Sequence, residues 1–393
     1  MASSFAHIPL PRGRPTCYAE RYEMLDAWRG LAALAVVVHH VSPWYIGGPA
    51  VMVFFVISGY CIAAASDACQ RRNMGFKQFM LRRIRRIYPP YLLSILFWFL
   101  TRLIKLWHTG VNDLDRPWTD WLQNLTLTQW VSLLFHPQNL AAENKTLFVA
   151  AYWSLGYEEQ FYLVFAIMMI LASVFGLSIR ATVGALIALS VAWIACFPVI
   201  SYGVFIEYWA MFGVGALVFY RLCRTTSLPR RRLIEASIVL IFAFAAFKRW
   251  FAGMHWGVPA TIFFEQRIGW NELVVAAGFA GILLLLRPLD STYARARWLS
   301  VPLGALGTIT YSLYLVHQFN LTFVSTVVEG ALRIVHAPEP PLAVLVALYC
   351  LGHIMLASVF WYFCERPFLN RSLTPPAAAS SPPPIAALAQ PGR

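Results

Sequence analysis

The chain has 393 residues, of which 59% are hydrophobic and only 12% are charged, and its formal net charge at pH 7 is +13. Soluble globular proteins carry about 25% charged residues, so this composition excludes an ordinary soluble domain and indicates a membrane protein with several spans. The basic residues are segregated between loops rather than gathered on one soluble face, which excludes a nucleic-acid partner.

We predict an all-α fold, a polytopic integral membrane bundle of about ten transmembrane helices. The predicted spans are residues 25–43, 48–66, 88–107, 151–176, 181–200, 203–220, 233–248, 271–287, 302–327 and 342–363. Residues 1–24 are polar and show no signal-peptide cleavage site, so we expect a cytoplasmic N-terminal segment before an uncleaved first span. Most of the 31 Lys and Arg residues then fall in inner segments, which predicts that both termini are cytoplasmic.

The first span combines a charged and a titratable residue, since Arg29 and His40 lie eleven positions apart in it. Eleven helical residues make about three full turns, so both side chains share one face and lie about 16 Å apart along the axis. Asp26 lies one turn before Arg29 and is placed to pair with it. His39 is rotated by about 100° from this face, so His40 is the candidate for chemistry. The alternative is a hydrogen-bonded interior histidine without a catalytic role.

The second span and the segment after it carry two further motifs. Ser58 and Gly59 are small residues that let helices approach closely. An arginine cluster follows, made of Arg82, Arg83, Arg85 and Arg86, with Tyr88 just beyond it. Arg83 and Arg86 are three apart and share a helical face, and their guanidinium forks suit the phosphates of a nucleotide, a lipid head group or coenzyme A.

The remaining motifs lie in an outer connection and in two later spans. In the connection 108–150, the spacing of its tryptophans, Trp118, Trp121 and Trp130, predicts an interfacial helix lying on the membrane. In the fourth span, Ser154, Glu158 and Tyr162 recur every four residues and form one polar stripe, or alternatively cap the helix start. In the ninth span, Tyr314 and His317 are three apart on one face.

Taken in order, these motifs resemble those of the acyltransferase 3 family, polytopic acyltransferases that modify envelope and secreted carbohydrates. The resemblance runs from about Tyr22 to Phe368. It rests on D-x-W-R-G with Arg-x10-His, F-F-V-I-S-G-Y, R-R-I-R-R-I-Y-P-P-Y, W-S-L-x-x-E-x-Q-F-Y, Y-S-L-Y-L-V-H and E-R-P. Tyr157 departs from the pattern, because members often have Val or Ile there.

The resemblance implies a membrane O-acyltransferase, specifically an O-acetyltransferase, at residues 25–368, with 369–393 as a disordered Pro/Ala-rich cytoplasmic tail. It implies catalytic roles for His40, Arg29 and Glu158, and acyl-CoA binding by Arg83, Arg86, Arg82 and Tyr88. The supporting polar candidates are Asp26, Ser58, Trp153, Ser154, Tyr162, Tyr314 and His317.

The implied donor is acyl-CoA, namely acetyl-CoA, and the implied acceptor is a hydroxyl of a cell-envelope or secreted glycan or of a glycolipid. We expect a multi-pass protein of the bacterial cytoplasmic (inner) membrane, surrounded by lipid and working beside glycan-assembly proteins. No bound cofactor is expected. The seven cysteines include no C-x-x-C pair, so the sequence predicts neither a metal site nor a disulfide framework.

Two other classes of function stay open on the sequence alone. A transporter or exporter of a glycan or other solute would use His40, Glu158 and His317 as a proton relay. A non-catalytic partner of a glycan synthase would need none of them. Within the enzyme hypothesis, direct transfer and an acyl group carried on His40 are both open.

Overall fold

The computed structural model describes residues 22–72, 74–139, 145–256, 269–336, 338 and 340–369. The expectations for residues 1–21 and for the tail beyond 369 lie outside these described residues. Within them the chain is helical almost throughout, which confirms the predicted all-α class. The described residues include one β-pairing, in which two-residue strands join antiparallel with Gln138 opposite Ser201.

The elements follow one another along the chain, and η marks a 3-10 helix except at η5, which is a π-helix. They are α1 Met24–Val41, α2 Gly47–Arg71, α3 Phe76–Thr109, α4 Trp118–Thr126, α5 Trp130–Phe135, β1 Gln138–Asn139, η1 Ala150–Tyr152, α6 Trp153–Phe175, α7 Ile179–Cys196, β2 Ile200–Ser201, α8 Ile206–Cys223, α9 Leu228–Trp256, α10 Gly269–Leu286, η3 Arg287–Leu289, α11 Asp290–Arg295, α12 Arg297–Thr308, α13 Thr310–Val316, η4 Gln318–Asn320, α14 Leu321–Ile334, α15 Leu342–Phe360, η5 Trp361–Glu365 and η6 Arg366–Phe368.

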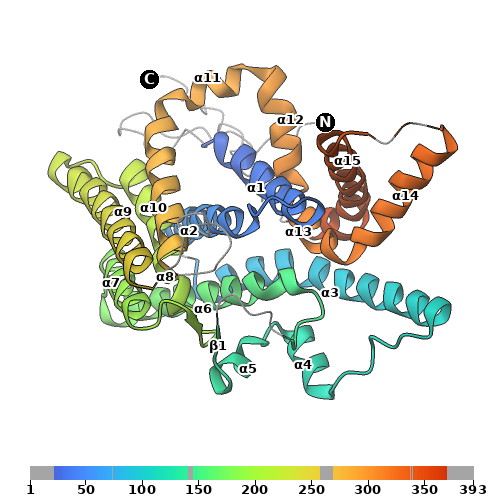
Figure 1. Ribbon diagram of the computed structural model, residues 1–393. Helices are drawn as coiled ribbons and strands as arrows, with labels where there is room; N and C mark the ends of the chain where they lie inside the picture. The colour runs from blue at the N-terminus through green and yellow to red at the C-terminus, as the bar shows by residue number, and fades with distance from the viewer. Residues whose placement is uncertain are drawn as a thin grey trace, which may run out of the picture.

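Figure 1 shows α1 near the centre of the molecule, with α2 beside it and α12, α13 and α15 gathered on its other side. The long helices α3 and α6 pack against each other as a layer across the bundle. The short helices α4 and α5 lie on the side of this layer that faces away from α1. The first helix is thus packed between the second helix and elements from the last third of the chain.

Among the described residues, eight helices are long and apolar enough to cross a membrane, or nine if the bent pair α12 and α13 counts as one span. The count of ten spans and the side of each terminus remain predictions. The span expected at 302–327 is not one continuous helix, because α12 and α13 meet at 48° and α14 follows a further 3-10 turn. The hydroxyls of Thr308 and Thr310 bond carbonyls one turn back, at 2.9 and 3.2 Å, which competes with regular helix bonding at the bend.

Two contacts fix the position of α1 in the bundle. The carboxylate of Asp290 accepts hydrogen bonds from the backbone N–H groups of Glu23 and Met24, at 3.2 and 2.9 Å, and so caps the start of the helix. Further along, Gly30 faces Gly307 of α12 so closely that a Cβ atom on Gly30 would lie 2.8 Å from the Gly307 nitrogen. Glycine at both positions therefore allows the two backbones to touch.

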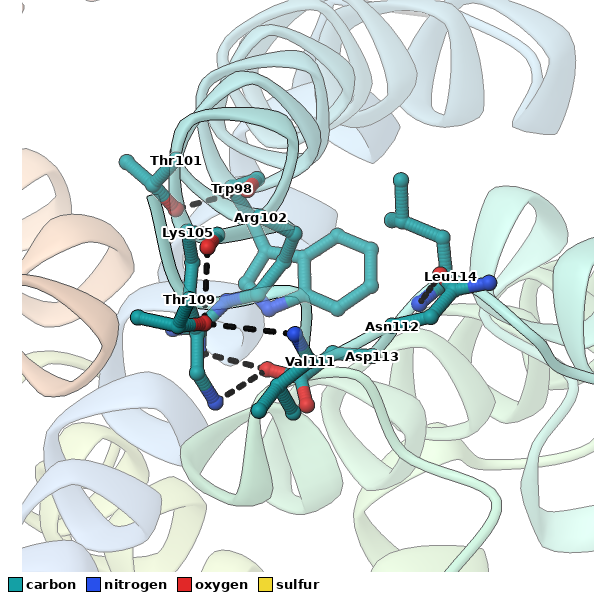
Figure 2. Close-up of polar contacts among 9 residues, drawn as sticks. All are labelled: Trp98, Thr101, Arg102, Lys105, Thr109, Val111, Asn112, Asp113 and Leu114. Carbon is teal, nitrogen blue, oxygen red and sulfur yellow. Dashed lines mark hydrogen bonds and ion pairs between the residues drawn. The ribbon is translucent and has the colours of Figure 1, made fainter. Parts of the chain in front are cut away.

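The end of α3 is tied to the chain that follows it (Figure 2). The carboxylate of Asp113 accepts hydrogen bonds from Arg102 at 3.1 Å and from Lys105 at 2.8 Å. Thr109 donates to the Lys105 carbonyl and accepts from the backbone N–H of Val111. These contacts turn the chain back along α3 instead of letting the helix continue.

The single interfacial helix expected within 108–150 is replaced by two short helices, α4 and α5. Trp118 is 74% exposed, whereas Trp121 packs against Trp98 of α3 and against Phe148. A single helix is not formed because the segment folds back and packs along the layer made by α3 and α6. Whether any part lies on a membrane surface stays a prediction.

Candidate active site

The face of α1 predicted to carry polar chemistry begins with an ion pair. Arg29 Nη1 lies 3.0 Å from Asp26 Oδ1, which confirms the predicted pairing one turn apart. Arg29 Nη2 also donates to the sulfur of Cys61 on α2, at 3.2 Å. The charge of Glu158 is near enough to interact with that of Arg29. The guanidinium is therefore held where α1, α2 and α6 meet.

The other end of the same face presents His40 to α13. The rings of His40 and His317 lie with their centroids 5.1 Å apart and their planes tilted by 39°. His39 turns instead toward the chain after α1, where its Nδ1 is 3.2 Å from the Trp44 carbonyl and its ring lies edge-on to Tyr45. The two adjacent histidines thus have different neighbours, as the helical rotation between them predicts.

The polar stripe of α6 meets the motif of α13. The hydroxyls of Ser154 and Tyr314 lie 2.7 Å apart, and Tyr314 also donates to the Ala151 carbonyl. The ring of Tyr314 lies beside that of His317, with centroids 5.8 Å apart. Two sequence motifs far apart in the chain are therefore joined at the histidine end of the site.

Further along α6, the carboxylate of Glu158 accepts a hydrogen bond from Ser58 of α2 at 3.3 Å and another from Tyr162. Its interaction with Arg29 places it at the arginine end of the site. Among the described residues, Glu158 makes no hydrogen bond to His40. The three polar residues Ser58, Glu158 and Tyr162, singled out separately in the sequence, form one connected group.

The arginine pair of α3 converges on the same group. The Arg83 guanidinium carbon lies 5.4 Å from the centroid of the Tyr162 ring and 5.8 Å from that of Phe79. The charge of Arg86 also acts on Tyr162, and it acts on Glu365 at the end of η5. Both guanidinium groups thus face one region, as their spacing predicts.

The two other residues grouped with this pair lie apart from it. Arg82 donates to the sulfur of Met74 at 3.4 Å, on the side of the loop between α2 and α3. The hydroxyl of Tyr88 bonds Glu159 and, at 3.3 Å, the Thr126 carbonyl of α4. The Tyr88 hydroxyl is therefore engaged with α4 and α6 and not with the arginines, and it links these two helices to α3.

Trp153 begins α6 within an aromatic cluster that includes Phe55, Tyr157 and Tyr208. The ring centroids of these three neighbours lie 6.0, 5.9 and 5.5 Å from that of Trp153. Aromatic contacts of this kind, two of them edge-to-face and the one with Tyr208 tilted, stabilise a packed core. The hydroxyl of Tyr157 bonds the buried Glu207. The residue that departs from the family pattern thus has a buried acidic partner.

Glu365 begins the E-R-P motif, but the sequence alone predicts no role for it. Its buried carboxylate accepts a hydrogen bond from the backbone N–H of Ser312, at 3.1 Å, and another from the Ser312 hydroxyl. Its charge interacts with those of Arg86 and Arg29. The π-helix η5 ends at this residue, and such irregular turns are frequent at functional sites.

A second residue without a predicted role is His353, fully buried in the middle of α15. Helix α15 contains no Asp, Glu, Lys or Arg, so a histidine there is the strongest polar signal that the segment carries. It is near enough to His40 and His317 that a proton on one of these rings would disfavour a proton on another. The histidine end of the site therefore has three imidazoles.

The site thus consists of two groups of side chains, which we call the arginine end and the histidine end. The arginine end comprises Arg29, Arg83, Arg86, Glu158, Tyr162 and Glu365. The histidine end comprises His40, His317, His353, Ser154 and Tyr314. Cations at one end suit an anionic group, and neutral imidazoles at the other suit proton transfer. Among the described residues, no three His, Cys, Asp or Glu side chains are grouped as metal ligands would be.

Comparison with known proteins gives one family match. A family model described as an acyltransferase domain matches residues 22–362. The curated relative "Putative membrane-bound transacylase BcsY" of Komagataeibacter xylinus is 27% identical over 307 residues, which are 75% of this chain and 71% of that protein. No solved structure matches the chain.

Two further relatives are named as O-acetyltransferases. "Peptidoglycan O-acetyltransferase OatA" of Listeria monocytogenes is 30% identical over 162 residues, covering 38% of this chain and 25% of that protein. "O-acetyltransferase OatA" of Staphylococcus aureus is 22% identical over 338 residues, covering 79% of this chain and 52% of that protein. The matched part is thus between a quarter and about half of these two relatives.

Proposed function

The chain belongs to the acyltransferase 3 family and is an acyltransferase, and from this premise we propose that it is an O-acetyltransferase of the bacterial inner membrane. In this proposal it moves an acetyl group from cytoplasmic acetyl-CoA to a hydroxyl of a cell-envelope or secreted glycan. The names of the two O-acetyltransferase relatives support the reaction. A peptidoglycan acceptor in the name of one of them supports the glycan class.

The observation that carries the proposal is that three helices each contribute to both ends of the site. Helix α1 carries Arg29 and His40, which lie about 16 Å apart along its axis. Helix α6 carries Ser154 at the histidine end and Glu158 at the arginine end. Helix α13 leads from the Glu365 contact to His317. A donor with an anionic head and a long flexible arm fits such an elongated arrangement.

The arginine end is proposed to bind the donor. Arg83 and Arg86 face one region and supply guanidinium forks for the phosphates of coenzyme A. The pantetheine arm then leads the thioester toward His40. Arg29 is proposed to stabilise negative charge that develops on the thioester oxygen or to hold the donor. Glu158 contributes by holding Tyr162 and Ser58 beside Arg29.

The histidine end is proposed to activate the acceptor. Neutral His40 takes the proton from the acceptor hydroxyl as its oxygen attacks the thioester carbonyl carbon. The carbon–sulfur bond then breaks, the ester is left on the glycan, and the thiolate of coenzyme A leaves and takes up the proton. General base catalysis of this kind contributes about 10²- to 10⁴-fold.

A two-step route uses the same residues. His40 would first attack the thioester, release coenzyme A and carry the acetyl group on its ring before the acceptor hydroxyl takes it over. Incubation with radiolabelled acetyl-CoA alone separates the two routes. Label that stays on the wild-type protein, and is absent from His40→Ala, indicates the two-step route, whereas unlabelled wild-type protein indicates direct transfer.

The proposed function is tested by mass spectrometry of surface and secreted glycans from the wild type, a gene deletion and a His40→Ala strain at equal expression. We expect both mutants to lose the mass of one acetyl group per modified site. If the deletion alters glycan export but His40→Ala does not, the transporter or synthase-partner alternative replaces the enzyme proposal. If neither strain loses acetyl groups, a glycan acceptor is wrong.

A further inference from the structure

His353 is a buried polar side chain to which the proposed reaction gives no role. Neither of its ring nitrogens has a hydrogen-bond partner among the described residues, and the side chain is fully buried. Buried polar groups in proteins are nearly always partnered, so an exception calls for a function. Cys350 lies one turn before it on α15, and its thiol is too weak a donor to explain an imidazole there.

His317 shows which of its nitrogens is available. Its Nδ1 lies 2.8 Å from the Tyr314 carbonyl and 3.1 Å from the Leu313 carbonyl. A carbonyl oxygen only accepts, so Nδ1 must carry the proton and the neutral ring has its lone pair on Nε2. That Nε2 is buried and has no partner among the described residues. His317 is thus prepared to accept a proton at Nε2.

The three histidines come from three helices that contact one another, α1, α13 and α15. His317 lies against the ring of His40, with centroids 5.1 Å apart. His353 is near enough to the other two rings that a proton on one histidine would disfavour a proton on another. The titratable neighbours are His39 on α1 and Tyr314 on α13, while Glu329 of α14 is engaged with Tyr349.

We propose that His317 and His353 form a buried relay that removes the proton from His40 during transfer. His40 takes the proton of the acceptor hydroxyl and passes it through a water molecule to Nε2 of His317, and a second water molecule carries it on to His353. When the carbon–sulfur bond breaks, the proton returns by the same path to the thiolate of coenzyme A. The acceptor oxygen gains the acetyl group and the sulfur gains the proton, so the reaction balances. His317 and His353 act through His40 and are positioning residues, and the inference rests on the proposed function.

The relay is tested with membranes that contain the full-length protein and its natural glycans, supplied with radiolabelled acetyl-CoA. His353→Asn keeps a polar group but cannot take up a proton. We expect it to lower kcat about tenfold, with the KM for acetyl-CoA unchanged. The loss should shrink as pH rises, because His40 must then release its proton to water, which is easier at high pH. A purely structural defect would lower the rate equally at all pH values.

His317→Asn separates the two nitrogens of that ring. The asparagine amide can still donate to the Tyr314 carbonyl in place of Nδ1–H, but nothing replaces Nε2. We expect a folded protein with the same pH-dependent loss, and His317→Gln, whose amide also cannot take up a proton, should show that loss too. His336→Asn, at an exposed histidine after α14 with a left-handed backbone, is the matched control and should behave as wild type.

The outcomes distinguish this inference from the proposed function. If His40→Ala is inactive while His353→Asn keeps the wild-type rate at every pH, or loses activity equally at every pH, the relay is wrong and the proposed function stands. If His40→Ala retains transfer, the proposed function fails as well. Nitrogen-15 NMR of histidine-labelled protein in lipid gives a readout independent of activity, and a neutral resting His317 ring that carries its proton on Nε2 instead of Nδ1 would overturn the relay.

Discussion

Gly307 of α12 packs against the carbonyl oxygen of Asp26 on α1, so that a Cβ atom at position 307 would overlap that oxygen. Asp26 in turn holds Arg29 by an ion pair of 3.0 Å. Gly307 therefore contacts the residue that holds the candidate catalytic residue Arg29. It sets how near α12 can come to the arginine end of the site.

We predict that Gly307→Ala destabilises the protein by about 1–3 kcal/mol, the usual cost of overpacking, and lowers acyl transfer by displacing Asp26 and Arg29. The matched control is Gly304→Ala in the same helix, where a Cβ atom meets nothing within 4 Å. That change should be neutral or stabilising by about 0.5–1 kcal/mol. Thermal melting in detergent measures both, and equal melting temperatures for the two variants would refute the contact argument.

The arginine pair gives a prediction about the donor. Arg83→Ala combined with Arg86→Ala should raise the KM for acetyl-CoA at least tenfold, because two phosphate-binding forks are lost. Arg83→Lys should recover only part of the binding, since a lysine has no fork. Arg85→Ala is the control, because Arg85 is exposed like Arg86 but lies off the face that Arg83 and Arg86 share. An unchanged KM in the double variant would remove the phosphate assignment.

The two adjacent histidines of α1 should differ sharply. His40→Ala removes the proposed base and should reduce transfer by about 10²- to 10⁴-fold. His39→Ala removes a ring that contacts the Trp44 carbonyl and Tyr45, so it should be tolerated much better. Transfer of label from acetyl-CoA to glycan measures both at equal expression. The reverse order of effects would show that the active face of α1 has been misassigned.

Two adjacent acidic residues of α6 also make a matched pair. Glu158→Gln weakens the charge that faces Arg29 and should lower transfer by about tenfold through misplacement of the arginine end. Glu159→Gln changes only a group bonded to Tyr88 and should leave transfer nearly unchanged. Steady-state rates of the two variants decide the matter. Equal losses would indicate that both carboxylates serve stability rather than the site.

Asp113 predicts a pH dependence of stability at the end of α3. The hydrogen bond from Lys105 lowers the pKa of the Asp113 carboxyl, with a further contribution from Arg102 against the opposing effect of burial. A lowered pKa means that the stabilisation is present above the unfolded value of about 3.9 and is lost as pH falls through the lower folded value. Asp113→Asn should therefore melt below wild type at pH 6, and the difference should shrink in acid.

The control for this prediction is Asp115→Asn, two residues later. Asp115 is exposed, so its replacement should change the melting temperature little at any pH. If Asp115→Asn reproduces the effect of Asp113→Asn, the loss reflects net charge in the loop. The specific contacts shown in Figure 2 would then not be its cause.

Helical periodicity explains why much of the site could be predicted from the sequence. Arg29, Asp26 and His40 lie on one helix, so their relative positions follow from 3.6 residues per turn. The same holds for Ser154 and Glu158 on α6. For each of these residues the neighbour on another helix was unknown, but the face that would meet it was fixed by spacing alone.

The parts that could not be predicted depend on contacts between distant segments. Tyr88 follows the arginines in sequence, yet its bond to Glu159 depends on how α6 packs against α3. The bend between α12 and α13 lies where Gly307 meets α1, and the spacing of the apolar residues does not predict it. His353 could have been found from its cost in an apolar helix, but its partners could not.

The close packing of α1 against late elements has a consequence for biosynthesis. Ribosomes deliver the chain from its N-terminus, so α1 reaches the membrane before Asp290, Gly307 and His317 have been translated. An arginine near the centre of a span costs about 2.5–3.5 kcal/mol on insertion scales. Asp26 lies on the same helix, one turn from Arg29, so this ion pair needs no later segment of the chain. The nascent helix thus carries its own counter-ion through insertion, and the histidine end assembles only when the last helices arrive.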